Sequence, residues 1–317
     1  MNKTILVFFK LNDEQKRFLE AAAPGCKFLY NANEEATEQQ LKNANIIIGN
    51  PTLEALEKAE NLELLQLMSA GVGEYAEEGV LPEQAILANS TGAYGLAISE
   101  FMLGLLLELY KNLHLYRDNQ AESIWSFRGK VKSIFNSTAL IIGLGDIGGE
   151  FAWRMKALGA YTIGIRRTDA RKPDYLDELY FMDKLEELLP RADIVALSLP
   201  ETKLTNKIIN KSTLELMKRD AVLINVGRGT TVDTEALCDA LENGLIRGAA
   251  LDVTEPEPLP AEHRLWKMKN VIITPHISGG FSLEETKTRI IKIAANNLSA
   301  LIEGRTLMNV VDRTKGY

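Results

Sequence analysis

Thr138-Ala139-Leu140-Ile141-Ile142-Gly143-Leu144-Gly145-Asp146-Ile147-Gly148 is the stretch that decides the fold. An apolar run of strand length ends here in Gly-x-Gly-x-x-Gly, and apolar residues then recur at helical spacing until Gly159. In a strand-turn-helix unit of this kind, Gly143 permits the turn, Gly145 lets a pyrophosphate approach the backbone, and Gly148 lets the helix pack closely on the strand. We therefore expect a dinucleotide site with its phosphates at the helix N-terminus, and a purely structural turn is the alternative. The expected contacts come from Gly143, Leu144, Gly145, Asp146, Ile147 and Gly148.

The composition is that of an ordinary globular protein. The 317 residues are enough for two domains, with 46% hydrophobic and 25% charged residues. A formal net charge of −7 argues against a general attraction to nucleic acid or to anionic membranes, so small molecules are the expected partners. Cys26 and Cys238 are far apart and outside any metal-ligand spacing, so we expect no metal site and a reducing cytoplasm.

Short apolar runs alternate with helical patterns along both halves of the chain. Strands are expected over residues 5–9, 27–30, 46–49, 64–68 and 86–88, and again over 162–165, 194–199, 222–226, 249–253 and 271–274. Alternating strands and helices predict parallel sheets, so the expected fold class is α/β with two doubly wound, Rossmann-like lobes.

Residues 98–117 are expected to form one helix that is apolar on nearly every face. Such a helix is buried on more than one side, and it predicts a homodimer because one lobe supplies too little cover. A central core helix is the alternative. The most apolar part of the expected helix carries Glu100 and Glu108 and is too short to span a membrane. His114, on the same helix, is expected to have a structural role.

Charged and small residues follow the strands of the second half, where a doubly wound sheet binds its ligands. His276 follows the last strand and can exchange a proton near neutral pH, unless it is structural. Glu257 is the candidate partner that would orient the imidazole and favour its charged form, although Glu255 competes for this role. Arg228 lies between two glycines, and its planar guanidinium can bind a carboxylate through two hydrogen bonds. In the alternative, Arg228 binds a phosphate or forms a structural ion pair.

Four stretches then carry a family resemblance: Gly-Leu-Gly-Asp-Ile-Gly at 143–148, Asn-Val-Gly-Arg-Gly at 225–229, Leu-Asp-Val-x-Glu-x-Glu-Pro-Leu-Pro at 251–260 and Thr-Pro-His-Ile-Ser-Gly-Gly at 274–280. In this order they resemble the D-isomer-specific 2-hydroxyacid dehydrogenases over essentially the whole chain. The resemblance implies that Arg228 binds and polarises a keto acid, that His276 is the acid/base, and that Glu257 orients His276. It also implies that the turn at 69–73 binds the substrate carboxylate through Ala70, Gly71 and Val72. Further expected cofactor contacts are Leu199, Pro200, Thr205, Val226, Gly227, Asp252, His276, Ser278 and Gly279.

The resemblance also implies a domain organisation. Residues 1–98 and 283–317 would form a discontinuous, flavodoxin-like substrate lobe, and residues 99–282 would form the dinucleotide-binding lobe. Helices near residues 98 and 283 would frame a hinge. We expect no regulatory domain of the kind found in long phosphoglycerate dehydrogenases.

The predicted function is reduction of a small 2-keto acid to a D-2-hydroxy acid, or the reverse, with a nicotinamide cofactor. One alternative is a nucleotide-sensing binding protein on the same scaffold, and another is a phosphoglycerate dehydrogenase-like activity. A formate dehydrogenase-like activity fits less well. The resemblance to that branch would imply a Gln–His pair, and this chain has Glu257 in place of the glutamine.

The residues after the second strand of the dinucleotide lobe predict which cofactor is preferred. NAD sites place an acid there to bond the ribose 2′-hydroxyl, whereas this chain reads Ile165-Arg166-Arg167-Thr168. Two guanidinium groups and a hydroxyl can hold a 2′-phosphate, so NADP is the expected cofactor and NAD the second choice. In the alternative interpretation, Arg166 and Arg167 are solvated and Asp169 binds the ribose.

Overall fold

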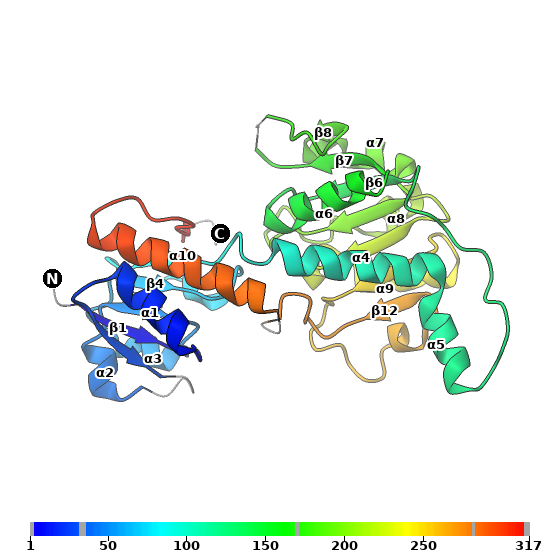
Figure 1. Ribbon diagram of the computed structural model, residues 1–317. Coiled ribbons are helices and arrows are strands. Elements are labelled where there is room, and N and C mark those ends of the chain that lie inside the picture. The colour runs from blue at the N-terminus through cyan, green and yellow to red at the C-terminus, as the bar shows by residue number, and fades with distance from the viewer. Residues whose placement is uncertain (1–2, 32–35, 169–170, 281–282, 314–317) are drawn as a thin grey trace. The chain divides into compact units, whose positions relative to one another are not determined.

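The computed structural model describes residues 3–31, 36–168, 171–280 and 283–313, in two compact units (Figure 1). The first unit comprises Met1–Tyr94 and Phe281–Tyr317, and the second comprises Gly95–Gly280. Within the described ranges, no helix is long and apolar enough to cross a membrane.

The first unit is a five-stranded parallel sheet in the order β2-β1-β3-β4-β5. Its strands are β1 (Thr4–Val7), β2 (Lys27–Tyr30), β3 (Ile46–Ile48), β4 (Leu64–Gln66) and β5 (Ile86–Ala88). Side chains alternate between the two faces, and each face has its own apolar core. One core contains residues of α1 (Asp13–Ala22) and α10 (Glu284–Ile302), and the other contains residues of α2 (Glu38–Lys42) and α3 (Leu53–Glu57).

The second unit is a seven-stranded parallel sheet in the order β12-β11-β10-β9-β6-β7-β8. Its strands are β6 (Thr138–Ile142), β7 (Tyr161–Ile165), β8 (Glu178–Tyr180), β9 (Ile194–Leu197), β10 (Val222–Asn225), β11 (Gly248–Leu251) and β12 (Val271–Ile273). The direction of winding reverses between β6 and β9, which is where a doubly wound sheet opens its ligand crevice. The glycine turn follows β6 at this point.

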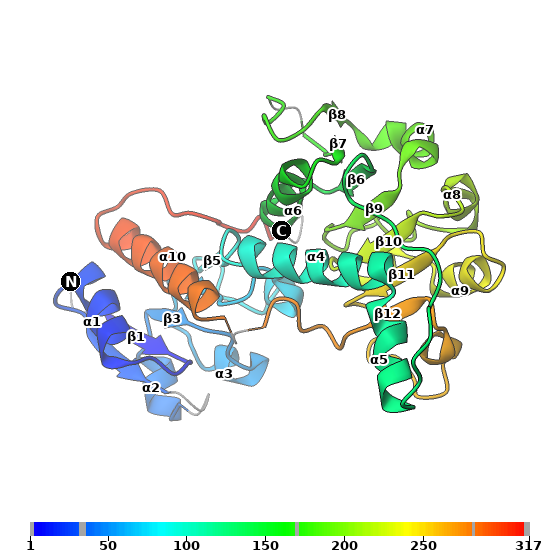
Figure 2. The ribbon, with the colours of Figure 1, turned by 45° about the vertical axis from the view of Figure 1, so that its right-hand side comes forward.

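Helices cover both faces of the larger sheet. On one face lie α4 (Gly95–Lys111) and α6 (Asp146–Ala157), as Figures 1 and 2 show. The opposite face packs against α7 (Leu185–Leu188), α8 (Lys211–Leu216) and α9 (Thr234–Glu242). The two sheets and their helix layers confirm the predicted α/β fold class with two doubly wound parallel lobes.

The long apolar helix differs from its prediction in two respects. It ends at Lys111, because Asn112 has a left-handed φ of 57°, and α5 (Leu113–Ala121) then begins in a new direction. Asn112 donates from Nδ2 to the carbonyl of Arg128, and this hydrogen bond stabilises the left-handed conformation. In addition, α4 packs on α6, β10 and β11, so the second unit itself covers most of its apolar surface.

Candidate active site

The three glycines of the turn after β6 have different surroundings. Gly143 has a φ of 96°, and a Cβ there would come within 2.7 Å of the Ser198 carbonyl oxygen. A Cβ at Gly148 would overlap the carbonyl oxygen of Gly143, so this glycine allows the close packing of α6 on the strand. At Gly145, by contrast, no described residue beyond its own chain neighbours lies within 4 Å of a Cβ position. The open approach is therefore at Gly145, at the N-terminus of α6.

The helix α6 begins at Asp146, directly after the glycine turn. Its N-cap, Gly145, supplies no side-chain hydrogen bond. The carboxylate of Asp146 accepts a hydrogen bond from the backbone N–H of Gly95, at 2.8 Å, and so joins the start of α4 to the start of α6. The backbone N–H groups at a helix N-terminus and the positive end of the helix dipole favour an anion at this position.

The two arginines after β7 lie at the expected place. The strand ends at Ile165, and the backbone N–H of Arg166 still bonds to Tyr180 in the neighbouring strand. The buried Nε of Arg166 has no acceptor among the described residues. Arg167 and Thr168 are exposed, and Asp169 lies outside the described residues. An unpaired guanidinium N–H beside the glycine turn suits an anionic ligand such as a phosphate.

The backbone around Arg228 is held by buried polar side chains. Asn225, at the end of β10, donates from Nδ2 to the carbonyl of Arg228 and accepts from the N–H of Gly227. Thr231 donates its hydroxyl to the same Arg228 carbonyl. The guanidinium of Arg228 is half-buried and has no carboxylate within ion-pair distance in the described part of the chain. Its Nη1 donates to the carbonyl of Gly227 at 2.8 Å, so the side chain is positioned and its other N–H groups can bind an anion.

His276 and Glu257 form a hydrogen-bonded pair. The His276 Nδ1 lies 2.6 Å from Oε1 of Glu257, although nineteen residues separate them in the chain. Both side chains are partly exposed, at 46% and 42%. The carboxylate occupies Nδ1, which leaves Nε2 as the ring nitrogen that can exchange a proton with a ligand.

Asp252 holds the turn that carries His276. Its side chain is buried, and its carboxylate accepts hydrogen bonds from the hydroxyl of Thr274, the N–H of Ile277, and both the N–H and hydroxyl of Ser278. Its carbonyl accepts the N–H of His276 at 2.8 Å. Asp252 therefore binds the turn on both sides of the histidine, and the cofactor contact expected of its carboxylate would be additional to these bonds.

The remaining residues expected to contact the cofactor lie after strands at the same edge of the sheet. Leu199 and Pro200 follow β9, and the hydroxyl of Thr205 donates to the carbonyl of Pro200. Val226 and Gly227 follow β10, and a Cβ at Gly227 would approach the Leu199 backbone to 2.7 Å. Ser278 is buried against Asp252, and Gly279 is half-buried beside it.

The expected carboxylate-binding residues Ala70, Gly71 and Val72 belong to the first unit, where they follow β4. Their expected role in binding the substrate carboxylate stays a prediction. Within the first unit, side chains that motif reasoning did not single out contact this turn. Asn50 and Asn89 bond to it directly.

Comparisons with known proteins agree with the geometry. The family model described as "D-isomer specific 2-hydroxyacid dehydrogenase, NAD binding domain" matches residues 103–278. A glyoxylate reductase from Thermofilum pendens is 34% identical over 260 residues, covering 79% of this chain and 75% of that protein.

Two solved structures are similar over the whole chain. A D-isomer specific 2-hydroxyacid dehydrogenase family protein from Aeromonas salmonicida has 32% identity and a TM-score of 0.88, covering 99% of this chain and 100% of its own. A D-isomer specific 2-hydroxyacid dehydrogenase from Xanthobacter autotrophicus, solved with NADPH and MES, has 26% identity and a TM-score of 0.82, with complete coverage of both chains.

Proposed function

Because this chain belongs to the D-isomer-specific 2-hydroxyacid dehydrogenase family, and is thus an NAD(P)-dependent oxidoreductase, we propose that it reduces a small 2-keto acid to the D-2-hydroxy acid, or catalyses the reverse reaction. Glyoxylate, hydroxypyruvate and their aliphatic homologues are the proposed substrates. The observation that carries the proposal is the His276–Glu257 hydrogen bond, at the edge of the sheet that also carries Arg228 and the glycine turn.

The proposed roles follow from the chemistry of a carbonyl reduction. A reduced nicotinamide cofactor, held by the glycine turn at Gly143–Gly148, would supply a hydride to the keto carbon, and the C=O bond would become a C–O bond. His276 gives the proton from Nε2 to the carbonyl oxygen, and Glu257 stabilises the imidazolium before this transfer. Arg228 binds the keto acid by charge-assisted hydrogen bonds and polarises its carbonyl. In the direction of oxidation, His276 accepts the proton.

The proposed preference for NADP rests on Arg166 and Arg167. An acid at the end of β7 would repel a 2′-phosphate, whereas Arg166 offers a buried N–H without an acceptor among the described residues. The phosphates of the cofactor would be held at Gly145 and the N-terminus of α6. NADPH bound to the Xanthobacter structure is consistent with this preference.

The function is tested by a panel of 2-keto acids, each assayed with NADPH and with NADH. The proposal expects turnover with at least one short keto acid and a higher kcat/KM with NADPH. A nucleotide-sensing protein on the same scaffold would bind the cofactor but turn over none of the panel.

A homodimer is also part of the proposal, and residues 122–135 support it. Figures 1 and 2 show this segment as an extended connection between α5 and β6. Its backbone is anchored, since Asn112 bonds to the carbonyl of Arg128 and Arg247 bonds to that of Lys130. Its large apolar side chains nevertheless face solvent: Ile124, Trp125, Phe127, Val131 and Phe135. Trp125 is fully exposed and Phe127 is 78% exposed.

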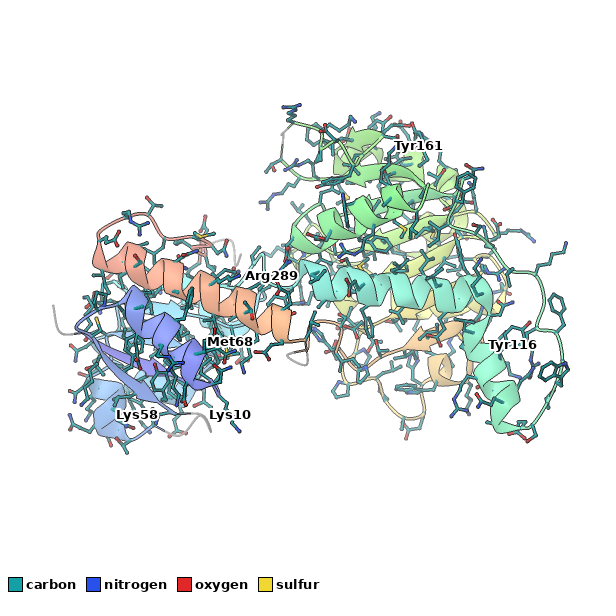
Figure 3. All side chains as sticks on the ribbon, viewed as in Figure 1. Lys10, Lys58, Met68, Tyr116, Tyr161 and Arg289 are labelled. Atoms are coloured by element: carbon teal, nitrogen blue, oxygen red, sulfur yellow. The ribbon has the colours of Figure 1, made fainter. Side chains whose placement is uncertain are left out.

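The size of this apolar surface fits a second copy of the chain. Aromatic side chains bury about 150–250 Å² each, so the three aromatic residues of the segment supply much of the roughly 800 Å² per partner in a standard interface. A hollow of about 720 Å³ lies beside Trp125 and Phe127, lined also by Tyr116, which Figure 3 labels on α5.

We place the protein in the cytoplasm, because Cys26 and Cys238 are unpaired.

A further inference from the structure

The turn after β4 has its carbonyl groups bound by other parts of the first unit. Asn89 donates from Nδ2 to the carbonyl of Ala70 at 2.9 Å, and Tyr94 donates its hydroxyl to the carbonyl of Met68 at 2.7 Å. The backbone N–H of Ser90 donates to the carbonyl of Ser69 at 3.0 Å. Figure 3 labels Met68, where this turn begins.

Asn50 holds the same turn from the loop after β3. Its Oδ1 accepts the N–H of Met68 at 3.1 Å, and its Nδ2 donates to the hydroxyl oxygen of Ser69 at 2.9 Å. That hydroxyl in turn donates to the carbonyl of Gly71 at 2.6 Å. Four consecutive carbonyls, from Met68 to Gly71, are therefore bonded within the unit.

Bound carbonyls determine where the amide groups point. A trans peptide is planar, with its C=O and N–H directed oppositely, so fixing the carbonyl of Ala70 also fixes the N–H of Gly71. The N–H groups of Ser69, Ala70 and Gly71 have no acceptor among the residues that the structure describes. Successive N–H groups without internal partners form an anion-binding concavity.

The C-terminal segment supports Asn89. The N–H of Asn89 donates to the carbonyl of Asn309, and Asn309 donates from Nδ2 to the carbonyls of Asn89 and Thr91. Asn89 also accepts the N–H of Thr91 through Oδ1. These hydrogen bonds hold both the backbone and the side chain of Asn89, so its Nδ2 is kept in place against the turn.

We propose that Asn50 and Asn89 are positioning residues that aim the amide groups of residues 69–71 at the carboxylate of the keto acid. This inference rests on the proposed function, since it assigns to these amides the carboxylate of that substrate. Neither asparagine contacts the substrate itself. Each acts by holding peptide groups in the orientation that an anion needs, before the anion arrives.

The test compares Asn89→Ala and Asn50→Ala with the wild-type protein, using glyoxylate and NADPH. We expect KM for glyoxylate to rise about tenfold, because an amide group that is no longer held in place loses its hydrogen bond to the charged carboxylate. The kcat and the KM for NADPH should stay within twofold, because the chemistry and the cofactor site are unchanged. Asn61→Ala is the matched control: its Nδ2 also donates to a backbone carbonyl of this unit, that of Lys42, and KM should not change.

Calorimetry with oxalate separates this inference from the proposed function. Loss of oxalate binding in Asn89→Ala, with wild-type binding intact, supports the positioning role even if no keto acid is turned over. An unchanged glyoxylate KM and an unchanged oxalate Kd in Asn89→Ala overturn it. So does a parallel fall of kcat and NADPH affinity together with the melting temperature, since that pattern indicates only a structural role. Asn50→Ala that fails to fold leaves the decision to Asn89→Ala.

Discussion

His276 has a left-handed backbone, with a φ of 51°. This conformation costs of order 1 kcal/mol or more for a residue other than glycine, and it persists only where neighbouring bonds hold it. Asp252 supplies those bonds on both sides of the histidine. The strain therefore lies at the residue to which we assign proton transfer, beside its partner Glu257.

Replacing His276 by alanine should lower kcat by roughly 10²-fold or more, the usual scale for losing a general acid, and leave cofactor affinity nearly unchanged. Steady-state kinetics and a fluorescence titration with NADPH measure the two quantities. His114→Ala is the matched control, because the His114 ring lies within hydrogen-bond distance of the backbone carbonyls of Glu108 and Lys269, outside the proposed site. Near-normal turnover of His276→Ala would remove the catalytic assignment.

Arg166→Asp should shift the ratio of kcat/KM for NADPH to that for NADH toward NADH by about tenfold or more. The reason is that a carboxylate there repels the 2′-phosphate and can bond the ribose hydroxyls. The kcat with NADPH should change little, because the substitution lies far from the transferred hydride. Arg219→Asp, at an exposed site of the same unit, should leave the ratio unchanged. Equal kcat/KM values for the two cofactors in the wild type would contradict the preference.

Residues with a motif could be singled out from the sequence, and residues without one could not. Arg228, Glu257 and His276 each follow a strand within a recognisable stretch, so their place at the sheet edge follows from strand order. Asn50 and Asn89 are single asparagines after two different strands. Only the packing of β4 between β3 and β5 brings their amides to one turn.

At the scale of elements, most strands of the sheets were predictable because they are short, buried and apolar. The strand β8 was missed because its residues Glu178, Leu179 and Tyr180 are only half-buried, at the edge of the sheet. The break at Asn112 was missed because apolar periodicity continues through it into α5, while the left-handed turn depends on the distant carbonyl of Arg128.

Glu178 joins β8 to its surroundings through its carboxylate. It accepts hydrogen bonds from Tyr161, Tyr180 and Arg191. These bonds, led by that from Arg191, lower the pKa of Glu178 to about 2. A carboxyl whose folded pKa is depressed stabilises the fold fully above its unfolded value, near 4.5, and loses that contribution as the pH falls toward 2.

Glu178→Gln should therefore lower the melting temperature of the second unit, Gly95–Gly280, by about 2–4 °C at pH 7, the shift expected for roughly 1 kcal/mol in a unit of this size. The difference from the wild type should shrink as the pH is lowered below about 4.5. Thermal unfolding at pH 7, 5 and 4 measures it. Glu187→Gln, which removes an exposed pair with Lys184, should have little effect at any pH. A difference that persists unchanged in acid would contradict the role given to the charge.

At the scale of the whole molecule, we propose that the dimer interface is formed by residues 122–135 and not by α4. The helix that suggested a dimer is largely covered by α6, β10 and β11 of its own unit. The double variant Trp125→Ser with Phe127→Ser should change the light-scattering mass from twice 35.2 kDa to 35.2 kDa at micromolar concentration. Leu216→Ser, another exposed apolar position, should leave the dimer intact. A wild-type mass of 35.2 kDa would rule the dimer out.

The central claim is that this chain reduces a 2-keto acid in the D sense, with His276 as the proton donor. The most direct measurement incubates the wild-type protein with hydroxypyruvate and NADPH, follows the loss of NADPH, and separates the product by chiral chromatography. The account predicts D-glycerate in a one-to-one ratio to the NADPH consumed. An L product, or no NADPH loss with hydroxypyruvate, glyoxylate or their short homologues, would contradict it.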